Sequence, residues 1–190
     1  MISQKEKIDF IYNSNMIEGI SYKKSLYNYK NYIKNYDKGF FEITGQIDAL
    51  NFVIENYKKE LTENRILKIH KLLTDDLLDK KNAGQYRKCN VIIGDHYGCF
   101  PIEIKPKMKS LIKLLKKVKN YNDCWDFHHE FEIIHPFIDG NGRTGRLILN
   151  WLLLKNGFDF EIIKYKNRFD YYNSINNYRF YKILSQEWKN

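Results

Sequence analysis

Residues 135–146 constrain the fold of this chain most, because they form a turn-rich segment directly before an apolar one. They read His-Pro-Phe-Ile-Asp-Gly-Asn-Gly-Arg-Thr-Gly-Arg. Pro136 disfavours helical geometry at His135, so we expect a preceding helix to end there. An apolar run begins at Leu147, which predicts that the loop opens a buried helix.

The polar groups of this loop suit a polyphosphate. Gly140 and Gly142 flank Asn141, and such a turn exposes consecutive backbone N–H groups at a helix start, where anions bind. Asn141 is also an expected N-cap residue. Arg143 and Arg146 lie three residues apart, on one side of the predicted helix, so both can point at phosphates.

Two further side chains of the loop suit the chemistry of a transfer reaction. Asp139 offers the hard carboxylate oxygen that a phosphate-bound Mg²⁺ prefers. His135 has an unperturbed pKa of about 6.5, which suits a general base near neutral pH. Each of these features alone occurs in ordinary turns and surface ion pairs. Their joint order and spacing favour a functional site.

The loop meets every fixed position of the Fic-family signature, His-x-Phe-x-Asp/Glu-Gly-Asn-Gly-Arg-x-x-Arg, and the chain resembles that family. Residues 84–87 and 91–96 resemble the approach to the family's substrate-positioning hairpin, the flap. The likeness covers about residues 10 to 180. It implies a mainly α, Fic-type helical bundle that forms a single domain over residues 1–190. Its parts would be an N-terminal inhibitory helix within residues 1–20, one β-hairpin flap over 89–100, and the catalytic motif over 135–146.

The resemblance also implies an activity. Fic enzymes with an intact motif are nucleotidyltransferases that move AMP from ATP onto a Ser, Thr or Tyr hydroxyl of a protein. His135 would be the base, Asp139 the ligand of Mg²⁺ or Mn²⁺, Arg143 the partner of the β-phosphate and Arg146 that of the γ-phosphate. The nucleotide-binding residues implied are Asp139, Gly140, Asn141, Gly142, Arg143, Thr144, Gly145, Arg146, Ile93, Gly94, Asp95, His96, Tyr171 and Tyr172.

Two details bear on the choice of reaction and nucleotide. A smaller branch of the family carries Ala-Asn-Lys-Arg in place of Gly-Asn-Gly-Arg and acts as a kinase, and this chain lacks that change. Tyr171 and Tyr172 resemble the family's aromatic pair, which helps to hold the adenosine. Family members often have Asn seven residues after this pair, near the adenine, whereas this chain has Arg179. The adenine contacts are therefore less defined by the resemblance than the phosphate contacts, and another nucleotide stays open.

Residues 14–19 resemble the family's inhibitory motif, Ser/Thr-x-x-x-Glu-Gly/Asn. Ser14 and Glu18 lie four residues apart on one helix face, with Gly19 as the expected stop. The resemblance implies that Glu18 pairs with Arg146 and competes with the γ-phosphate. An activator would then displace Glu18, and a partner, a change of oligomeric state such as a homo-oligomer, a metal or a modification all remain open.

Two other functions stay open beside self-inhibited adenylylation, which includes modification of the chain itself. The first is the reverse reaction, in which Glu18 positions a water that removes AMP from a modified protein. The second is a basic nucleic-acid-binding or protein-binding module with an inactive site, which the net charge of +9 suggests. The lysines after Met108, however, alternate with apolar residues at helical spacing, which indicates a solvated helix face rather than a nucleic-acid partner.

Length and composition indicate the number of domains and the compartment of the protein. At 190 residues we expect one domain with a sizeable core. No apolar run approaches the roughly 20 residues of a membrane span, and the first residues lead to no signal-peptide apolar region. We therefore expect a cytoplasmic protein without a membrane partner. Cys89 and Cys99 flank the expected hairpin, but a disulfide between them is disfavoured in a reducing compartment.

The periodicity of apolar residues predicts several helices. One begins after Thr62 as its N-cap and carries His70, to which we assign a structural role. His128 and His129 are adjacent on a helix and diverge in direction, which argues against a shared metal. The other predicted helices cover residues 4–18, 22–36, 43–59, 105–119, 122–134, 142–155 and 168–187.

Overall fold

The computed structural model describes residues 2–22, 38–94 and 96–187. Its α-helices are α1 (Gln4–Ile17), α2 (Lys38–Asn56), α3 (Glu63–Thr74), α4 (Pro101–Leu114), α5 (Tyr121–Ile134), α6 (Asn141–Lys155) and α7 (Arg168–Glu187). Two 3-10 turns are η3 (Leu115–Lys117) and η4 (Tyr165–Asn167), and a small antiparallel hairpin joins β1 (Ile92–Ile93) to β2 (His96–Tyr97). The predicted mainly α fold with one hairpin is confirmed for the described residues.

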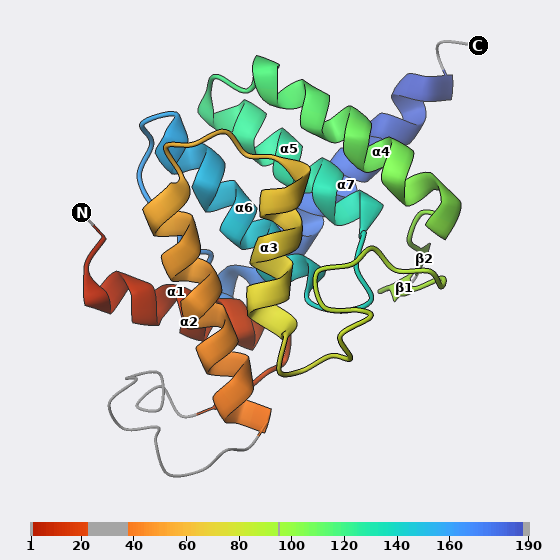
Figure 1. Cartoon of the computed structure of the whole chain (residues 1–190). Coiled ribbons are helices and arrows are strands. Elements are labelled where there is room, and N and C mark those ends of the chain that lie inside the picture. The colour runs from red at the N-terminus through yellow and green to blue at the C-terminus, as the bar shows by residue number, and fades with distance from the viewer. Residues whose placement is uncertain (1, 23–37, 95, 188–190) are drawn as a thin grey trace.

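Helix α6 is the centre of the bundle. It packs against α1, α2, α3 and α5, and Figure 1 shows it between the α2–α3 pair and α5. Most of its side chains are therefore buried, from Leu147 through Leu153. This burial explains why its first turn, which carries the polar loop, is held in one position by the surrounding helices.

Capping residues explain where several helices begin. Ser3 and Glu6 form a capping box at α1, and Asn120 and Asp123 form another at α5. The predicted N-cap Thr62 accepts a hydrogen bond from the Arg65 amide, which confirms that prediction. Helix α4 starts four residues earlier than predicted, at Pro101, because proline suits the first turn of a helix.

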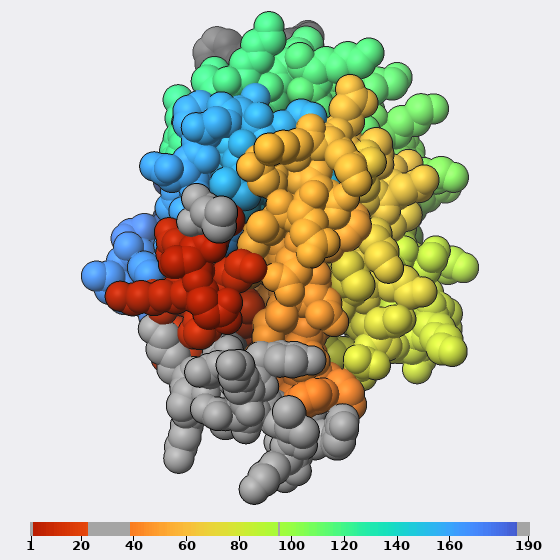
Figure 2. Space-filling view, turned by 60° about the vertical axis from the view of Figure 1, so that its left-hand side comes forward, coloured from red at the N-terminus to blue at the C-terminus, as the bar shows by residue number. Residues whose placement is uncertain are grey.

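Helix α1 lies on the outside of the bundle. It contacts α2, α6 and η4, and Figure 2 shows it in red against the orange surface of α2 and a blue surface from later in the chain. Gly19 ends it with a φ of 75°, as expected of a helix stop. The predicted helix over residues 22–36, apart from its first residue, and the predicted site residue Asp95 lie outside the described residues.

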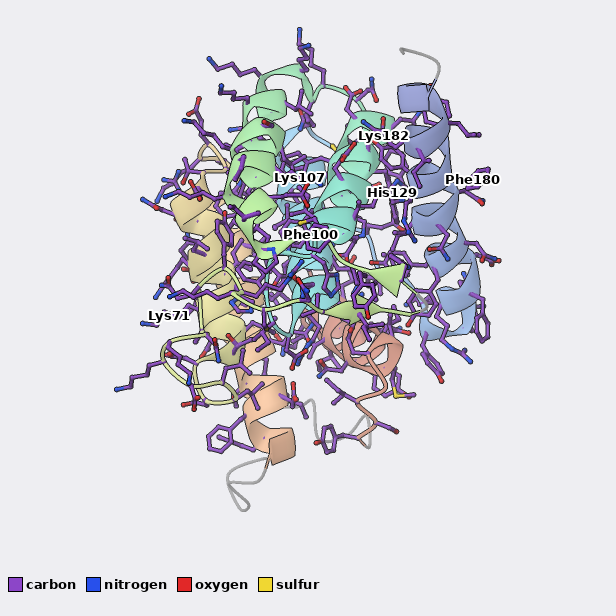
Figure 3. The ribbon with its side chains drawn as sticks, turned by 90° about the vertical axis from the view of Figure 1, so that its right-hand side faces the viewer. Lys71, Phe100, Lys107, His129, Phe180 and Lys182 are labelled. Carbon is purple, nitrogen blue, oxygen red and sulfur yellow. The ribbon has the colours of Figure 1, made fainter. Side chains whose placement is uncertain are left out.

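The hairpin and α7 complete the described structure. Figure 3 shows the hairpin above α1, with one end directed toward the lower part of α7. Its register pairs Ile92 with Tyr97 and Ile93 with His96. None of the helices in the described ranges is both long and apolar enough to cross a bilayer.

Candidate active site

His70 of α3 holds the loop between α5 and α6 in place. Its ring stacks on Phe137 with centroids 3.7 Å apart. The Gly84 amide donates to Nδ1 at 2.9 Å, so Nε2 carries the proton and donates to the Asp139 carbonyl at 3.0 Å. Burial lowers the pKa of His70 to about 4, which keeps this neutral tautomer near pH 7. The structural role expected of His70 is confirmed.

Asn141 closes the same loop, but not as the predicted N-cap. Its side chain accepts from the Phe137 amide at 2.8 Å and donates to the Phe137 carbonyl at 2.9 Å. The N-cap position is Gly140, whose φ of 74° suits glycine. The prediction was wrong because this amide meets both backbone groups of Phe137, which a helix cap would leave unpaired in a buried loop.

His135 ends α5 in a left-handed conformation, with φ 50° and ψ 61°. Its Nδ1 lies 3.2 Å from the Glu132 carbonyl, an acceptor, so Nδ1 carries the proton and Nε2 is left as a proton acceptor. Burial lowers the pKa of His135 to about 4, outweighing the Glu132 carbonyl and the Glu18 carboxylate, which raise it. The imidazole is therefore neutral near pH 7 and can act as a base.

Arg87 fixes the root of the hairpin to this histidine. It is buried, and its Nε donates to the His135 carbonyl at 2.7 Å. Its two Nη atoms donate to the carbonyls of Cys89 at 2.8 Å and Cys99 at 2.6 Å, one on each leg of the hairpin. The local sequence does not predict this contact, because two of the acceptors lie 12 and 48 residues away.

The guanidinium of Arg146 joins α6 to the end of α1. Its Nη2 donates to Glu18 Oε1 at 2.8 Å and to the Ser14 carbonyl at 2.9 Å, and its Nε donates to Ser14 Oγ at 3.0 Å. The expected pairing of Glu18 with Arg146 is present. Burial alone would lower the pKa of Arg146, but Glu18, Tyr171 and Glu132 together raise it, so the group stays charged.

Glu18 also lies against the first turn of α6. A Cβ placed on Gly142 would collide with Glu18 Oε1 and would lie 3.0 Å from Arg146 Nη1. Glycine at this position is therefore required for an anion to approach the helix N-terminus closely. The Glu18 carboxylate therefore lies at the N-terminus of α6, a position that suits an anion.

A cavity of about 460 Å³ opens beside this ion pair. Most of the predicted site residues outside the loop line it, together with three from the loop itself. The predicted residues in its lining are Glu18, Ile93, Gly94, His96, His135, Gly142, Arg146, Tyr171 and Tyr172. Of the residues not predicted, Glu132, Ile133, Ile175 and Asn176 line it as well, and so does Arg179.

Tyr171 and Tyr172, the aromatic pair in the cavity lining, form hydrogen bonds with neighbouring helices. The Tyr171 hydroxyl lies 2.9 Å from His128 Nε2 and 3.5 Å from Arg146 Nη1. The Tyr172 hydroxyl donates to the Ile17 carbonyl at 2.6 Å, at the last residue of α1. His129 bonds Ser174 at 3.2 Å, so the two adjacent histidines serve different partners on α7.

Other predicted residues lie behind the cavity rather than in its lining. Arg143 is 2% exposed and pairs with Glu42 of α2, with Nη2 also 3.7 Å from Asp139 Oδ2. Thr144 is fully buried. A Cβ on Gly145 would collide with Glu132 Oε1, so glycine there admits the Glu132 side chain.

Sequence reasoning missed Glu42 and Glu132, since each is an ordinary carboxylate in a helical segment. Glu132 is buried, and its Oε1 has no hydrogen-bond partner. Burial raises the pKa of Glu132 to about 8, although Arg146 opposes this, so the carboxyl holds a proton near pH 7. The carboxylate that Arg146 contacts directly is that of Glu18.

Asp139 is the residue of the loop that suits a divalent cation. Its carboxylate is 62% exposed, and Oδ1 accepts from the Gly140 amide at 2.6 Å. Within the described ranges, no three His, Cys, Asp or Glu side chains gather as a metal cage. Mg²⁺ commonly takes one or two carboxylates and completes its shell with substrate phosphates and water, so a single exposed aspartate fits it.

Comparisons with known proteins agree with this geometry. Residues 60–153 match the model of the Fic/DOC family. A relative named protein adenylyltransferase Fic, from Nematostella vectensis, is 31% identical over 181 residues, covering 87% of this chain and 42% of the relative. Protein adenylyltransferase fic-1 of Caenorhabditis elegans is 27% identical over 143 residues, covering 70% of this chain and 28% of that protein. The chain thus spans less than half the length of these curated relatives.

Solved structures share the fold. A Fic domain containing signaling protein from Bacteroides thetaiotaomicron superposes with a TM-score of 0.78 at 25% identity, over 90% of this chain and 71% of that one. Fic-1 from C. elegans superposes with a TM-score of 0.77 at 21% identity, over 92% of this chain and 56% of that one. With the complete motif at the start of α6, these likenesses show that the chain belongs to the Fic/DOC family.

Proposed function

We propose that this chain is a self-restrained protein adenylyltransferase, which transfers AMP from Mg-ATP to a Ser, Thr or Tyr hydroxyl of a protein. The observation that carries the proposal is the position of the Glu18 carboxylate between Gly142 and Arg146 at the start of α6. Helix N-termini bind anions, so this place suits the terminal phosphate of a nucleotide. The names of the curated relatives support the same reaction.

His135 would drive the transfer step. Its Nε2 takes the proton of the target hydroxyl while the hydroxyl oxygen attacks the α-phosphorus. The bond from that phosphorus to the bridging oxygen breaks, pyrophosphate leaves, and AMP stays on the protein as a phosphoester. The neutral imidazole, with its Nδ1 proton held by the Glu132 carbonyl, suits this role.

The loop would bind and orient the phosphates. Backbone N–H groups of the first turn of α6 would face the anion, and Arg146 would supply the charge for the terminal phosphate. Asp139 would hold Mg²⁺, which neutralises charge on the phosphates when bound. The side chains lining the far part of the cavity, Tyr171 and Tyr172 with Asn176 and Arg179, would surround the nucleoside.

Restraint follows from competition for one guanidinium. Glu18 and a γ-phosphate both require Arg146 Nη2, and both require the space above Gly142. ATP would therefore bind weakly or with its phosphates displaced while α1 is in place. Glu18 is 31% exposed, so its carboxylate can leave for water at little desolvation cost.

The reverse reaction is the second candidate. Glu18 lines the same cavity as His135, so it could orient a water for attack on an AMP-protein ester. This alternative predicts release of AMP from a premodified protein, and loss of that release in Glu18→Gly.

Transfer of label from α-labelled ATP tests the proposal. The chain would be compared with Glu18→Gly, with Glu18→Gly plus His135→Ala, and with Glu60→Gly as the matched control. Glu60 is an exposed carboxylate outside the helices. Label on the chain itself or on lysate proteins should rise in Glu18→Gly, stay at the basal level in Glu60→Gly and vanish in the double variant.

Equal labelling of Glu18→Gly and the unmodified chain would reject self-restraint. Equal labelling with and without His135 would reject the assigned base. No label from any variant, combined with AMP release from a premodified protein, would favour the reverse reaction.

A further inference from the structure

Both arginines of the catalytic motif are paired with carboxylates from N-terminal helices, but the two pairs differ in burial. Glu18 at the end of α1 is 31% exposed, whereas the Glu42 side chain on α2 is 5% exposed against an Arg143 that is 2% exposed. A buried carboxylate cannot leave its charged partner without losing compensation for its desolvation. The Glu42–Arg143 pair is therefore a permanent part of the bundle, unlike the pair formed by Glu18.

Arg143 reaches two carboxylates at once. Nη1 binds Glu42 Oε2, and Nη2 lies 3.7 Å from Oδ2 of Asp139, four residues earlier in the chain. The latter distance is too long for a hydrogen bond. Arg143 is absent from the lining of the cavity that contains Arg146. Its guanidinium thus lies behind the loop, held toward α2.

We infer that Glu42 is a positioning residue for the proposed reaction, which holds Arg143 back so that the Asp139 carboxylate stays available to a divalent cation. The inference rests on the proposed function, because it concerns the carboxylate that would hold the metal. Glu42 acts through Arg143 and touches neither nucleotide nor metal.

The geometry of guanidinium groups supports this role. A guanidinium prefers to bind a carboxylate through two parallel N–H groups. Without the charge of Glu42, the nearest carboxylate to Arg143 is Asp139, and a two-point contact there would occupy the oxygens that a cation needs. The local charge would also change, because Glu42, Arg143 and Asp139 together carry one net negative charge and the loss of Glu42 leaves none. Both effects weaken the attraction of a divalent cation.

Binding of α,β-methylene-ATP tests the inference apart from catalysis, since its α–β bond cannot be cleaved in the transfer. Its Kd would be measured by calorimetry with Mg²⁺ and with EDTA, in a Glu18→Gly background. The ratio of the two Kd values gives the gain in affinity that the metal supplies. We expect Glu42→Gln to reduce this gain at least fivefold and to leave the metal-free Kd unchanged or lower.

Two further variants show whether Glu42 works through Arg143. Glu42→Gln combined with Arg143→Gln removes the competing guanidinium. Arg143 is also the expected partner of the β-phosphate, so we expect both Kd values to rise together, while their ratio returns to within about threefold of the parent value. Glu42→Asp retains the charge and should keep most of the gain. If Glu42→Gln alone fails to fold, the gain can still be measured in the double variant and in Glu42→Asp. Glu55→Gln, an exposed carboxylate on the same helix, is the control and should leave the gain unchanged.

The outcomes separate this inference from the proposed function. If the Glu18→Gly parent shows a metal-dependent gain that Glu42→Gln does not lower, or that the double variant does not restore, the inference is wrong while the proposed function stands. Tighter nucleotide binding by Glu42→Gln in the presence of Mg²⁺ would overturn it in favour of a second inhibitory carboxylate. A parent that binds no nucleotide under either condition would overturn both.

Discussion

The Tyr172 hydroxyl donates a 2.6 Å hydrogen bond to the carbonyl of Ile17, the last residue of α1. The donor belongs to the aromatic pair in the cavity lining, and the acceptor precedes Glu18 directly. One hydroxyl thus ties the expected nucleoside pocket to the segment that carries the restraining carboxylate. The two would be coupled, since movement of α1 frees Tyr172 and movement of Tyr172 loosens α1.

Tyr172→Phe should therefore raise the basal labelling of an otherwise unmodified chain. The ring stays, and the lost hydrogen bond is worth about 1 kcal/mol, which corresponds to up to about a fivefold increase in released α1. Transfer from α-labelled ATP measures this. Tyr181→Phe, on an exposed position of the same helix, is the matched control and should have no effect. A decrease in labelling by Tyr172→Phe, with the control unchanged, would contradict the restraining role of this contact.

The pH dependence of transfer should reflect the neutral state of His135. The pKa of this group is about 4 in the folded chain, and Glu18→Gly removes one group that raises it. The imidazole is thus an acceptor over the neutral range and loses that capacity as the pH falls through about 4. We expect a flat rate from pH 8 to 6 for Glu18→Gly, with circular dichroism to check that the chain is folded. An inflection near pH 6.5 would indicate a solvated histidine instead.

Glu132 should make the protein less stable at alkaline pH. Its folded pKa is about 8 against a reference value of 4.5, so the folded state retains a proton that the unfolded state releases between these values. This contribution to stability must then fall as the pH rises toward 8, by about 1–2 kcal/mol between pH 6.5 and 8. The buried histidines act in the opposite direction over this range, because they are neutral when folded and still release protons when unfolded. The effect of Glu132 is therefore the difference between the unmodified chain and a variant that lacks its carboxyl group.

Urea unfolding at pH 6.5 and 8 measures the effect of Glu132. Glu132→Gln keeps the shape of the side chain without the titration. Relative to the unmodified chain, its free energy of unfolding should gain about 1–2 kcal/mol between pH 6.5 and 8. Glu130→Gln, on the same helix in an ion pair with Lys182, should follow the unmodified chain at both pH values. The assignment fails if Glu132→Gln changes with pH as the unmodified chain does.

His70→Phe should destabilise the chain although its ring can still stack on Phe137. The Gly84 amide and the Asp139 carbonyl would both lose their partner in a buried setting. Such a loss costs about 2–4 kcal/mol for the two groups together. His70→Gln offers one donor and one acceptor and should cost less. Thermal unfolding compares the two, and an equal loss would show that packing, rather than hydrogen bonding, explains the histidine.

Chemistry that acts over a few residues could be predicted from the sequence. Pro136 ends α5 at His135, Thr62 caps α3, and Gly19 ends α1, because each effect depends on the backbone of near neighbours. The motif is of the same kind, since Gly140 and Gly142 lie at the start of α6, where we expect an anion to bind. The ion pair of Glu18 with Arg146, by contrast, could be expected only from the resemblance to a family.

The role of Asn141 could not be predicted from its near neighbours in the sequence. An amide before a helix suits a cap, but it also suits both backbone groups of Phe137, and the buried loop decides for the second. Side-chain propensity offers several partners to such a residue. The packing of the loop against His70 buries the backbone of Phe137, and this burial determines that Asn141 pairs with it.

The sequence by itself determined the mainly α fold and the position of the motif at a helix start, because these depend on short-range backbone geometry. It also determined which side chains we expect to hold phosphate, metal and proton, because that expectation depends on their chemistry. The tertiary structure alone decided that Glu42 binds Arg143, that burial raises the pKa of Glu132, and that Arg87 joins the hairpin to His135. A carboxylate in a helix reads as an ordinary solvated group until another helix packs over it. Burial then changes its charge and its partner, and burial is a property of the whole bundle.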